Sequence, residues 1–126
     1  MRVGDRAELT RTYTGDDLRA FRDLADGGDS GADAVPEPLI GALFSYLLGV
    51  KLPGFGTNYL KQETRFLARA RVGAPLIASV EITRLRPEKH LADLETVCRA
   101  EDGTVIAKGR ALVLVRDVGK AIAPAQ

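Results

Sequence analysis

Apolar residues between positions 39 and 48 recur at the spacing of one broad face of an α-helix. This pattern predicts a helix over 38–48 with one buried side. Gly49 is expected to end it, because glycine readily takes the left-handed conformation of a helix C-cap. The letters LPGFG follow and predict a rigid turn before a strand that begins near Thr57. The apolar helix positions are Leu39, Leu43, Phe44, Leu47 and Leu48.

The second half of the chain alternates apolar and polar residues, which is the pattern of β-strands with one buried face. The alternation runs through 76–83, 94–99 and 105–115. Between the last two stretches stands Asp102-Gly103, a dipeptide typical of tight hairpin turns. A buried helix followed by three long antiparallel strands indicates an α+β fold in which a curved sheet wraps around one helix.

The beginning of the chain predicts a strand, a short helix and a loop. Residues 6–13 alternate sufficiently for a strand, and Thr14 is a good N-cap for a helix with acidic residues in its first turn. The stretch 27–36 has the composition of a loop. We expect a single domain over 1–118 and a flexible tail, rich in alanine and proline, over 119–126.

Composition narrows the class of protein. The 18 Lys and Arg residues nearly balance the 17 Asp and Glu residues, so no excess charge favours nucleic acid or an anionic membrane as a partner. No apolar run is long enough to cross a bilayer, and the first residues lack an apolar signal core, so we expect a soluble cytoplasmic protein. One histidine, His90, and one cysteine, Cys98, offer too few ligands for a zinc site, and no metal is expected.

The central segment resembles a known family. Over 43–67 it reads LFSYLLGVKLPGFGTNYLKQETRFL and is similar to the MaoC-like dehydratases and (R)-specific enoyl-CoA hydratases. Members typically read L-F-S-x-L-L-G, then L-P-G-x-G, then a Y-L strand. The resemblance extends to Val3-Gly4-Asp5 and to the strand over 78–86, and it covers nearly the whole chain except 27–38. It implies a hot-dog fold, in which an antiparallel sheet wraps around a central helix.

The resemblance also implies a ligand and an assembly. Subunits of this family form a dimer whose sheets join edge to edge, with an acyl thioester between the subunits. We therefore expect a homodimer, or a heterodimer with a related hot-dog subunit, that binds acyl-CoA or an acyl carrier protein. CoA or phosphopantetheine then enters as part of the substrate, and no separate cofactor is expected.

This chain lacks most of the family's catalytic motif. Family hydratases carry G-D-x-N-P-x-H before the central helix and H-G at its start. Their Asp and first His activate water, and the backbone N–H of the helix-opening Gly polarises the thioester carbonyl. Here Gly28-Asp29 matches the first two letters, but Ala34 stands at the His position and Pro36-Glu37 at the H-G position. The family segment that forms an overhang above the site is also absent from the sequence.

This departure leaves three interpretations open. The chain is a subunit that binds thioester without catalysis or pairs with an active partner. Alternatively its chemistry is repurposed, as an isomerase, cyclase or thioesterase, or it is a hydratase or dehydratase that uses substitute residues. The carboxylates near the family's active site, Asp29, Asp33 and Glu37, are our candidate catalytic groups. The simpler alternative is that Glu37 only caps the helix and Asp29 only holds a turn.

Four residues are candidates for substrate binding. Phe55 and Tyr59 either line an acyl tunnel or pack in the core. Arg65 either meets a phosphate of CoA or of the carrier arm, or is an ordinary solvated arginine. Ser45 lies in the middle of the predicted helix, where its hydroxyl either faces a ligand or bonds a backbone carbonyl.

Overall fold

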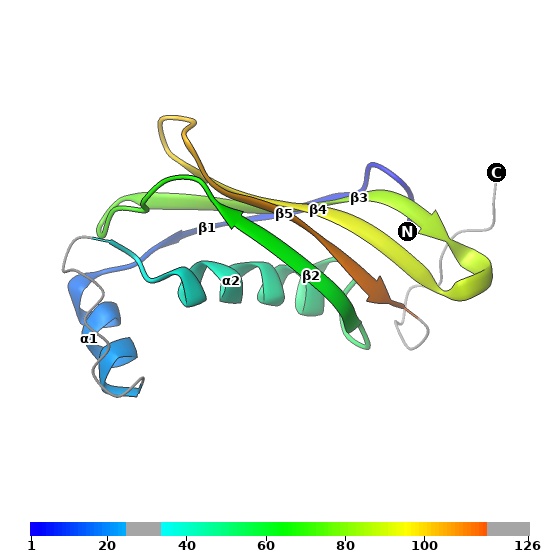
Figure 1. Ribbon diagram of the computed structural model, residues 1–126, viewed down its shortest axis with the longest axis horizontal. Helices are drawn as coiled ribbons and strands as arrows, with labels where there is room; N and C mark the ends of the chain where they lie inside the picture. Colours follow the sequence, from blue (N-terminus) through cyan, green and yellow to red (C-terminus); the bar gives the residue numbers. More distant parts are fainter. Residues whose placement is uncertain (25–33, 116–126) are drawn as a thin grey trace.

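The computed structural model describes residues 1–24 and 34–115 and shows a five-stranded antiparallel sheet with a helix lying along it (Figure 1). The spatial order of the strands is β1-β3-β4-β5-β2, so β1 and β2 are the edges. The predicted α+β architecture is therefore confirmed. The strands are β1 Arg6–Thr12, β2 Asn58–Phe66, β3 Pro75–Arg86, β4 Leu91–Ala100 and β5 Val105–Leu114. The helices are α1 Gly15–Leu24 and α2 Glu37–Tyr46, with a π-helical turn Leu47–Lys51 after α2 and a 3-10 turn Pro87–Lys89 after β3.

The central helix begins one residue before its predicted start. Pro36 precedes α2, and Pro38 occupies its first turn, where the missing N–H of proline costs no intrahelical hydrogen bond. This local chemistry fixes Glu37 as the first residue of the helix.

The prediction that Gly49 ends the helix is wrong. The chain stays helical through Lys51, and Gly49 is not among the glycines with positive φ. The helical path ends at Leu52, which is extended and whose N–H donates to the Leu47 carbonyl over 2.8 Å. Left-handed conformations appear only afterwards, at Gly54 and Gly56 in the predicted turn.

One face of α2 and its π-helical extension is buried beneath the sheet. Val80, Leu94 and Val113, one from each of the three alternating stretches, are completely buried. Tyr59 belongs to the sheet as expected, but it is 44% exposed because β2 is an edge strand. The fully buried helix residues are Ile40, Phe44, Leu47 and Leu48.

The corner between β1 and α1 holds one end of α2 in place. Thr14 caps α1 as predicted: the N–H of Asp17 donates to its hydroxyl over 3.2 Å, and the N–H of Thr14 donates to the Asp17 carboxylate over 2.8 Å. This backbone N–H holds the pKa of the Asp17 carboxyl below its usual value. Beside the cap, the buried Tyr13 donates its hydroxyl to the carbonyl of Leu39 over 3.2 Å. That hydrogen bond links the end of β1 to the first turn of α2.

Strand β2 lies unusually close to β5, and Gly109 permits this approach. Gly109 is the cross-strand partner of Thr64. A Cβ added at Gly109 would collide with the carbonyl of Glu63 and lie 2.9 Å from the Cα of Thr64. Only glycine lets two backbones come this near. β2 also runs beside α2, and the two elements line one groove (Figure 1).

The remaining strand predictions also hold where the structure tests them. The Asp102-Gly103 turn joins β4 to β5, with Gly103 at φ +92 and the Thr104 N–H bonded to the Asp102 carboxylate. The expected flexible tail over 119–126 lies outside the described residues.

Candidate functional site

An open groove of about 730 Å³ lies between α2 and β2. It runs along the side of α2 that the sheet does not bury. Its volume falls within the range of roughly 300–1,000 Å³ that is typical of small-molecule sites. The lining residues are Glu37, Pro38, Gly41, Ala42 and Ser45 of α2, and Gln62, Thr64 and Phe66 of β2.

The helix side of the groove consists of small residues. Pro38, Ala42 and Ser45 are spaced four and three residues apart, so they fall on one face of α2, with Gly41 beside them. Short side chains at these positions leave space between the helix and β2. The groove therefore exists because this face of α2 carries no large side chain.

The start of α2 supplies both a carboxylate and a backbone donor. Glu37 is exposed and lines the groove. The first N–H groups of a helix have no partner inside it. Pro38 has no N–H, and the N–H of Leu39 donates to the Pro36 carbonyl over 3.0 Å. Among residues 1–24 and 34–115 the N–H of Glu37 has no backbone acceptor, so it can donate at this end of the groove, where the helix dipole favours negative charge.

The strand side of the groove presents two polar side chains and one aromatic ring. Gln62, Thr64 and Phe66 alternate along β2 and face α2, whereas the residues between them point to the other side of the sheet. Our sequence reasoning did not select these three residues. Counting every second residue from Tyr59 would have selected Lys61, Glu63 and Arg65 instead, because an irregularity between Tyr59 and Lys61 shifts the register of the strand.

A hydrogen bond joins the two elements near Ser45. Tyr59 of β2 donates its hydroxyl to the backbone carbonyl of Ser45 over 3.0 Å. Ser45 thus lines the groove with its side chain while its carbonyl anchors Tyr59. The groove extends from Glu37 at the start of α2 toward this hydrogen bond.

The structure separates the other predicted site residues from the groove. Phe55 is 77% exposed in the turn before β2 and does not line it. Arg65 points to the opposite face of the sheet, where it lines a second depression. Asp29 and Asp33 lie outside the described residues. The groove therefore brings together two of the predicted residues, Glu37 and Ser45, with Tyr59 at its end.

Two further residues with chemical potential lie away from the groove. Cys98 is buried on β4, and this burial raises the pKa of its thiol to about 11, so the nucleophilic thiolate is scarce near neutrality. His90 is exposed in the turn between β3 and β4. Within 1–24 and 34–115, no group of three or more His, Cys, Asp or Glu side chains is placed to hold a metal ion. The helices described there are all too short or too polar to span a membrane.

The arrangement suits a ligand that has a polarisable carbonyl and an apolar chain. A carbonyl oxygen at the start of α2 would meet the N–H of Glu37 and the positive end of the helix dipole. The adjacent carboxylate can exchange a proton with a neighbouring carbon or water. The apolar chain would lie along the small residues of α2 and against Phe66.

Comparison with known proteins gives clear relatives. The (R)-specific enoyl-CoA hydratase of Aeromonas caviae is 32% identical over 126 aligned residues, which cover 90% of this chain and 94% of that protein. An (R)-specific enoyl-CoA hydratase of Rhodospirillum rubrum is 38% identical over 77 residues, covering 61% of this chain and 53% of that protein. No model of a protein family matches the chain.

Solved structures agree with these relatives. The R-hydratase of Aeromonas caviae superposes with a TM-score of 0.82 and 32% identity, over 90% of this chain and 96% of that one. An R-hydratase of Pseudomonas aeruginosa gives 0.81 and 25% identity, over 100% of this chain and 92% of that one. A MaoC-like dehydratase of Rhodospirillum rubrum shares the fold, with a TM-score of 0.68 and 16% identity over 90% of this chain and 91% of that one.

Proposed function

Because the chain belongs to the MaoC-like hot-dog family of (R)-specific enoyl-CoA hydratases, we propose that it binds an acyl thioester in the groove between α2 and β2. The acyl group is an enoyl or 3-hydroxyacyl chain, carried on CoA or on an acyl carrier protein. The observation that carries this proposal is the groove itself. In it a helix start, two polar strand side chains and an aromatic ring face one open volume of about 730 Å³.

The thioester carbonyl is placed at the start of α2. In the family, the backbone N–H of the glycine that opens the central helix polarises this carbonyl, and Glu37 stands at that position here. A backbone N–H does not depend on the side chain, so Glu37 can donate from the same place. Negative charge that develops on the thioester oxygen is stabilised there by the N–H and by the helix dipole. The replacement of glycine therefore leaves this half of the site intact.

The acid–base half of the site departs from the family. Hydration of an enoyl thioester places a hydroxyl group on the β-carbon and a proton on the α-carbon, so one group must take a proton from water and return one to carbon. Ala34, at the position of the family histidine, can do neither. Glu37 lines the groove, which supports it as the substitute base. Asp29 and Asp33 are the other candidates.

A non-catalytic partner subunit is the second candidate function. Ala34 and Pro36 stand where the family has its two histidines, and this double replacement favours it. In this arrangement the groove still holds a thioester, while a related hot-dog subunit supplies the acid–base groups. A repurposed isomerase, cyclase or thioesterase would instead use Glu37 as its base without adding water to a double bond.

The experiment is turnover of crotonyl-CoA by the purified protein and three variants. Loss of a general base costs about 10² to 10⁴ in rate, so we expect the wild type alone to hydrate this substrate poorly. Any turnover should fall further in Glu37→Gln or Asp29→Asn. Glu88→Gln, which removes an exposed carboxylate from the turn between β3 and β4, is the matched control and should not change the rate.

The outcomes separate the candidates. Turnover that is robust and disappears only in Asp29→Asn would restore an ordinary hydratase. Robust turnover in all variants would show that the chemistry lies on other residues. Binding of a non-reactive acyl-CoA analogue without turnover, with activity appearing when a related hot-dog subunit is added, would establish the partner function.

We also propose that the protein is a dimer whose sheets join edge to edge. β2 is an edge of the described sheet, so its outer N–H and C=O groups are available to a further strand. Tyr59 and Leu60 on this strand are 44% and 54% exposed, an unusual amount of apolar surface for a free edge. Light scattering at micromolar concentration should give twice the mass of the chain, and a monomer there contradicts the proposal.

A further inference from the structure

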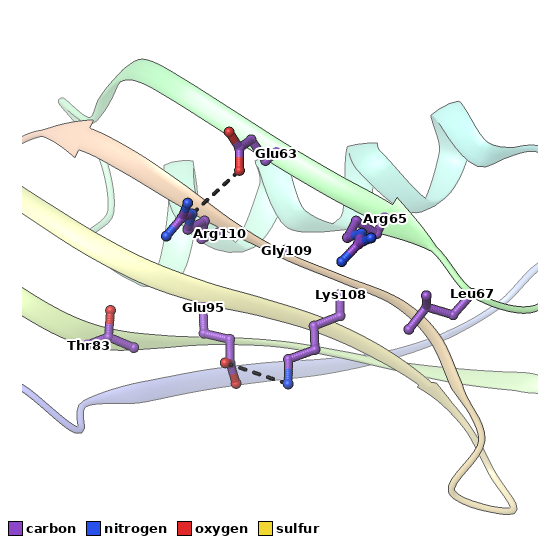
Figure 2. Close-up of a pocket in the computed structure, with 8 residues that line it drawn as sticks. All are labelled: Glu63, Arg65, Leu67, Thr83, Glu95, Lys108, Gly109 and Arg110. Atoms are coloured by element: carbon purple, nitrogen blue, oxygen red, sulfur yellow. Dashed lines mark ion pairs between the residues drawn. The ribbon is translucent and has the colours of Figure 1, made fainter.

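The outer face of the sheet, opposite α2, carries a depression of about 450 Å³ over β2 and β5 (Figure 2). It is separate from the groove, because Glu63, Arg65 and Leu67 reach it from the side of β2 that points away from the helix. The other lining residues come from β3, β4 and β5. They are Thr83, Glu95, Lys108, Gly109 and Arg110.

Most charges around the depression are paired. Arg110 lies 3.5 Å from the Glu63 carboxylate, and Lys61 lies 3.3 Å from it. These two cations, Lys61 foremost through its hydrogen bond, hold the pKa of the Glu63 carboxyl below its usual value. Both cations in this part of the surface therefore have a carboxylate partner.

The next cross-strand pair is different, because two cations face each other. Arg65 and Lys108 are direct partners in the β2–β5 ladder. Like charges at such positions destabilise a sheet. Lys108 extends to Glu95 at 3.9 Å, whereas Arg65 has no ion pair among the described residues. Figure 2 shows the Arg65 guanidinium beside β5, with no dashed line to it.

We infer that this depression binds the phosphate of a nucleotide. A guanidinium offers a fork of N–H donors that matches phosphate, and a nearby ammonium adds a second positive charge. Leu67, at the edge of the depression, is 60% exposed and supplies an apolar surface for the base or sugar. An anion between Arg65 and Lys108 removes the repulsion of the pair.

Two sources of this phosphate are compatible with the site. One is the nucleotide end of a CoA thioester, and this identification rests on the proposed function. The groove and the depression lie on opposite faces of β2, whose edge is covered in the proposed dimer. One such molecule then reaches both sites by passing the end of the strand at Phe66 and Leu67. The other source is a free nucleotide that binds independently of the thioester.

The test is calorimetric titration with adenosine 3′,5′-bisphosphate, whose readout does not depend on turnover. We expect saturable binding that weakens about tenfold in Arg65→Gln and in Lys108→Gln, because each removes a charge-assisted contact. Lys89→Gln removes the same charge from an exposed position on the distant turn Pro87–Lys89 and should bind like the wild type. Absence of binding, or equal binding by all variants, would overturn the inference.

Competition then identifies the source. If the site holds the nucleotide end of CoA, crotonyl-CoA displaces the bisphosphate while the pantetheine thioester of the same acid does not. If crotonyl-CoA fails to displace it, the site serves a free nucleotide. A protein without any thioester turnover can still pass this test, so failure of the proposed function and failure of this inference are distinguishable.

Discussion

The two sides of α2 differ in the size of their side chains, and this difference separates the fold from the candidate site. On one side, Phe44 and, in the π-helical turn that continues α2, Leu47 and Leu48 are completely buried under the sheet. On the other, Gly41 and Ala42 belong to the open groove. Large apolar residues fill the space between helix and sheet, whereas small residues leave a volume that a ligand can occupy.

The buried side of α2 was easier to predict from the sequence than the groove side. The buried side has to satisfy a demand that every sheet-covered helix shares, namely removal of apolar surface from water. The residues on the groove side are constrained only by the ligand that they contact. Its pattern is therefore a set of small residues without a general periodic signal.

Truncation on the buried side should give the largest loss of stability. Leu47→Ala removes a fully buried side chain, and we expect it to lower the free energy of unfolding by roughly 2–5 kcal/mol. Ser45→Ala, two residues away on the groove side, should change it by less than about 0.5 kcal/mol. Urea denaturation monitored by circular dichroism measures both. Equal midpoints for the two variants would contradict the division of α2 into a buried and an open side.

The sequence was sufficient for the fold because its strongest signals are periodic. The helix pattern around Phe44 and the strand alternation through Val80 and Leu94 depend on burial alone, and the structure buries all three. Gly49 was assigned wrongly because a glycine signals a possible helix end, while the π-helical turn is a tertiary outcome in which the chain continues to bury Leu48.

The candidate site was predicted only in part because it is assembled from distant segments. Glu37 and Ser45 were identified on a single helix, whereas their neighbours Gln62 and Thr64 come from β2, a strand that is held in the sheet by its pairing with β5. A pairing between strands far apart in sequence is not visible in local patterns.

The pairing of β2 with β5 can be disrupted through Gly109. Gly109→Ala introduces a Cβ that collides with the backbone of Glu63, and we expect a loss of about 1–3 kcal/mol in the free energy of unfolding. Gly41→Ala is the matched control, since its Cβ meets nothing within 4 Å. There the better helix propensity of alanine should stabilise the protein by about 0.5–1 kcal/mol. Thermal denaturation should show a lower stability for Gly109→Ala and a higher stability for Gly41→Ala. Unchanged stability in Gly109→Ala would show that β2 does not need this close contact.

The smallest expected effect concerns the hydrogen bond that joins β2 to α2. Tyr59→Phe removes the hydroxyl that donates to the Ser45 carbonyl over 3.0 Å and keeps the ring. A hydrogen bond contributes about 0.5–1.5 kcal/mol to stability, and the half-exposed position of Tyr59 places the expected loss at the low end of that range. Tyr46→Phe removes the hydroxyl of a similarly exposed tyrosine on α2, for which no hydrogen bond occurs among the described residues, and should have no effect. Chemical denaturation in parallel measures the difference. If both variants lose the same stability, the contact between Tyr59 and Ser45 does not hold the open side of α2 to β2, and the end of the groove must be set by another contact.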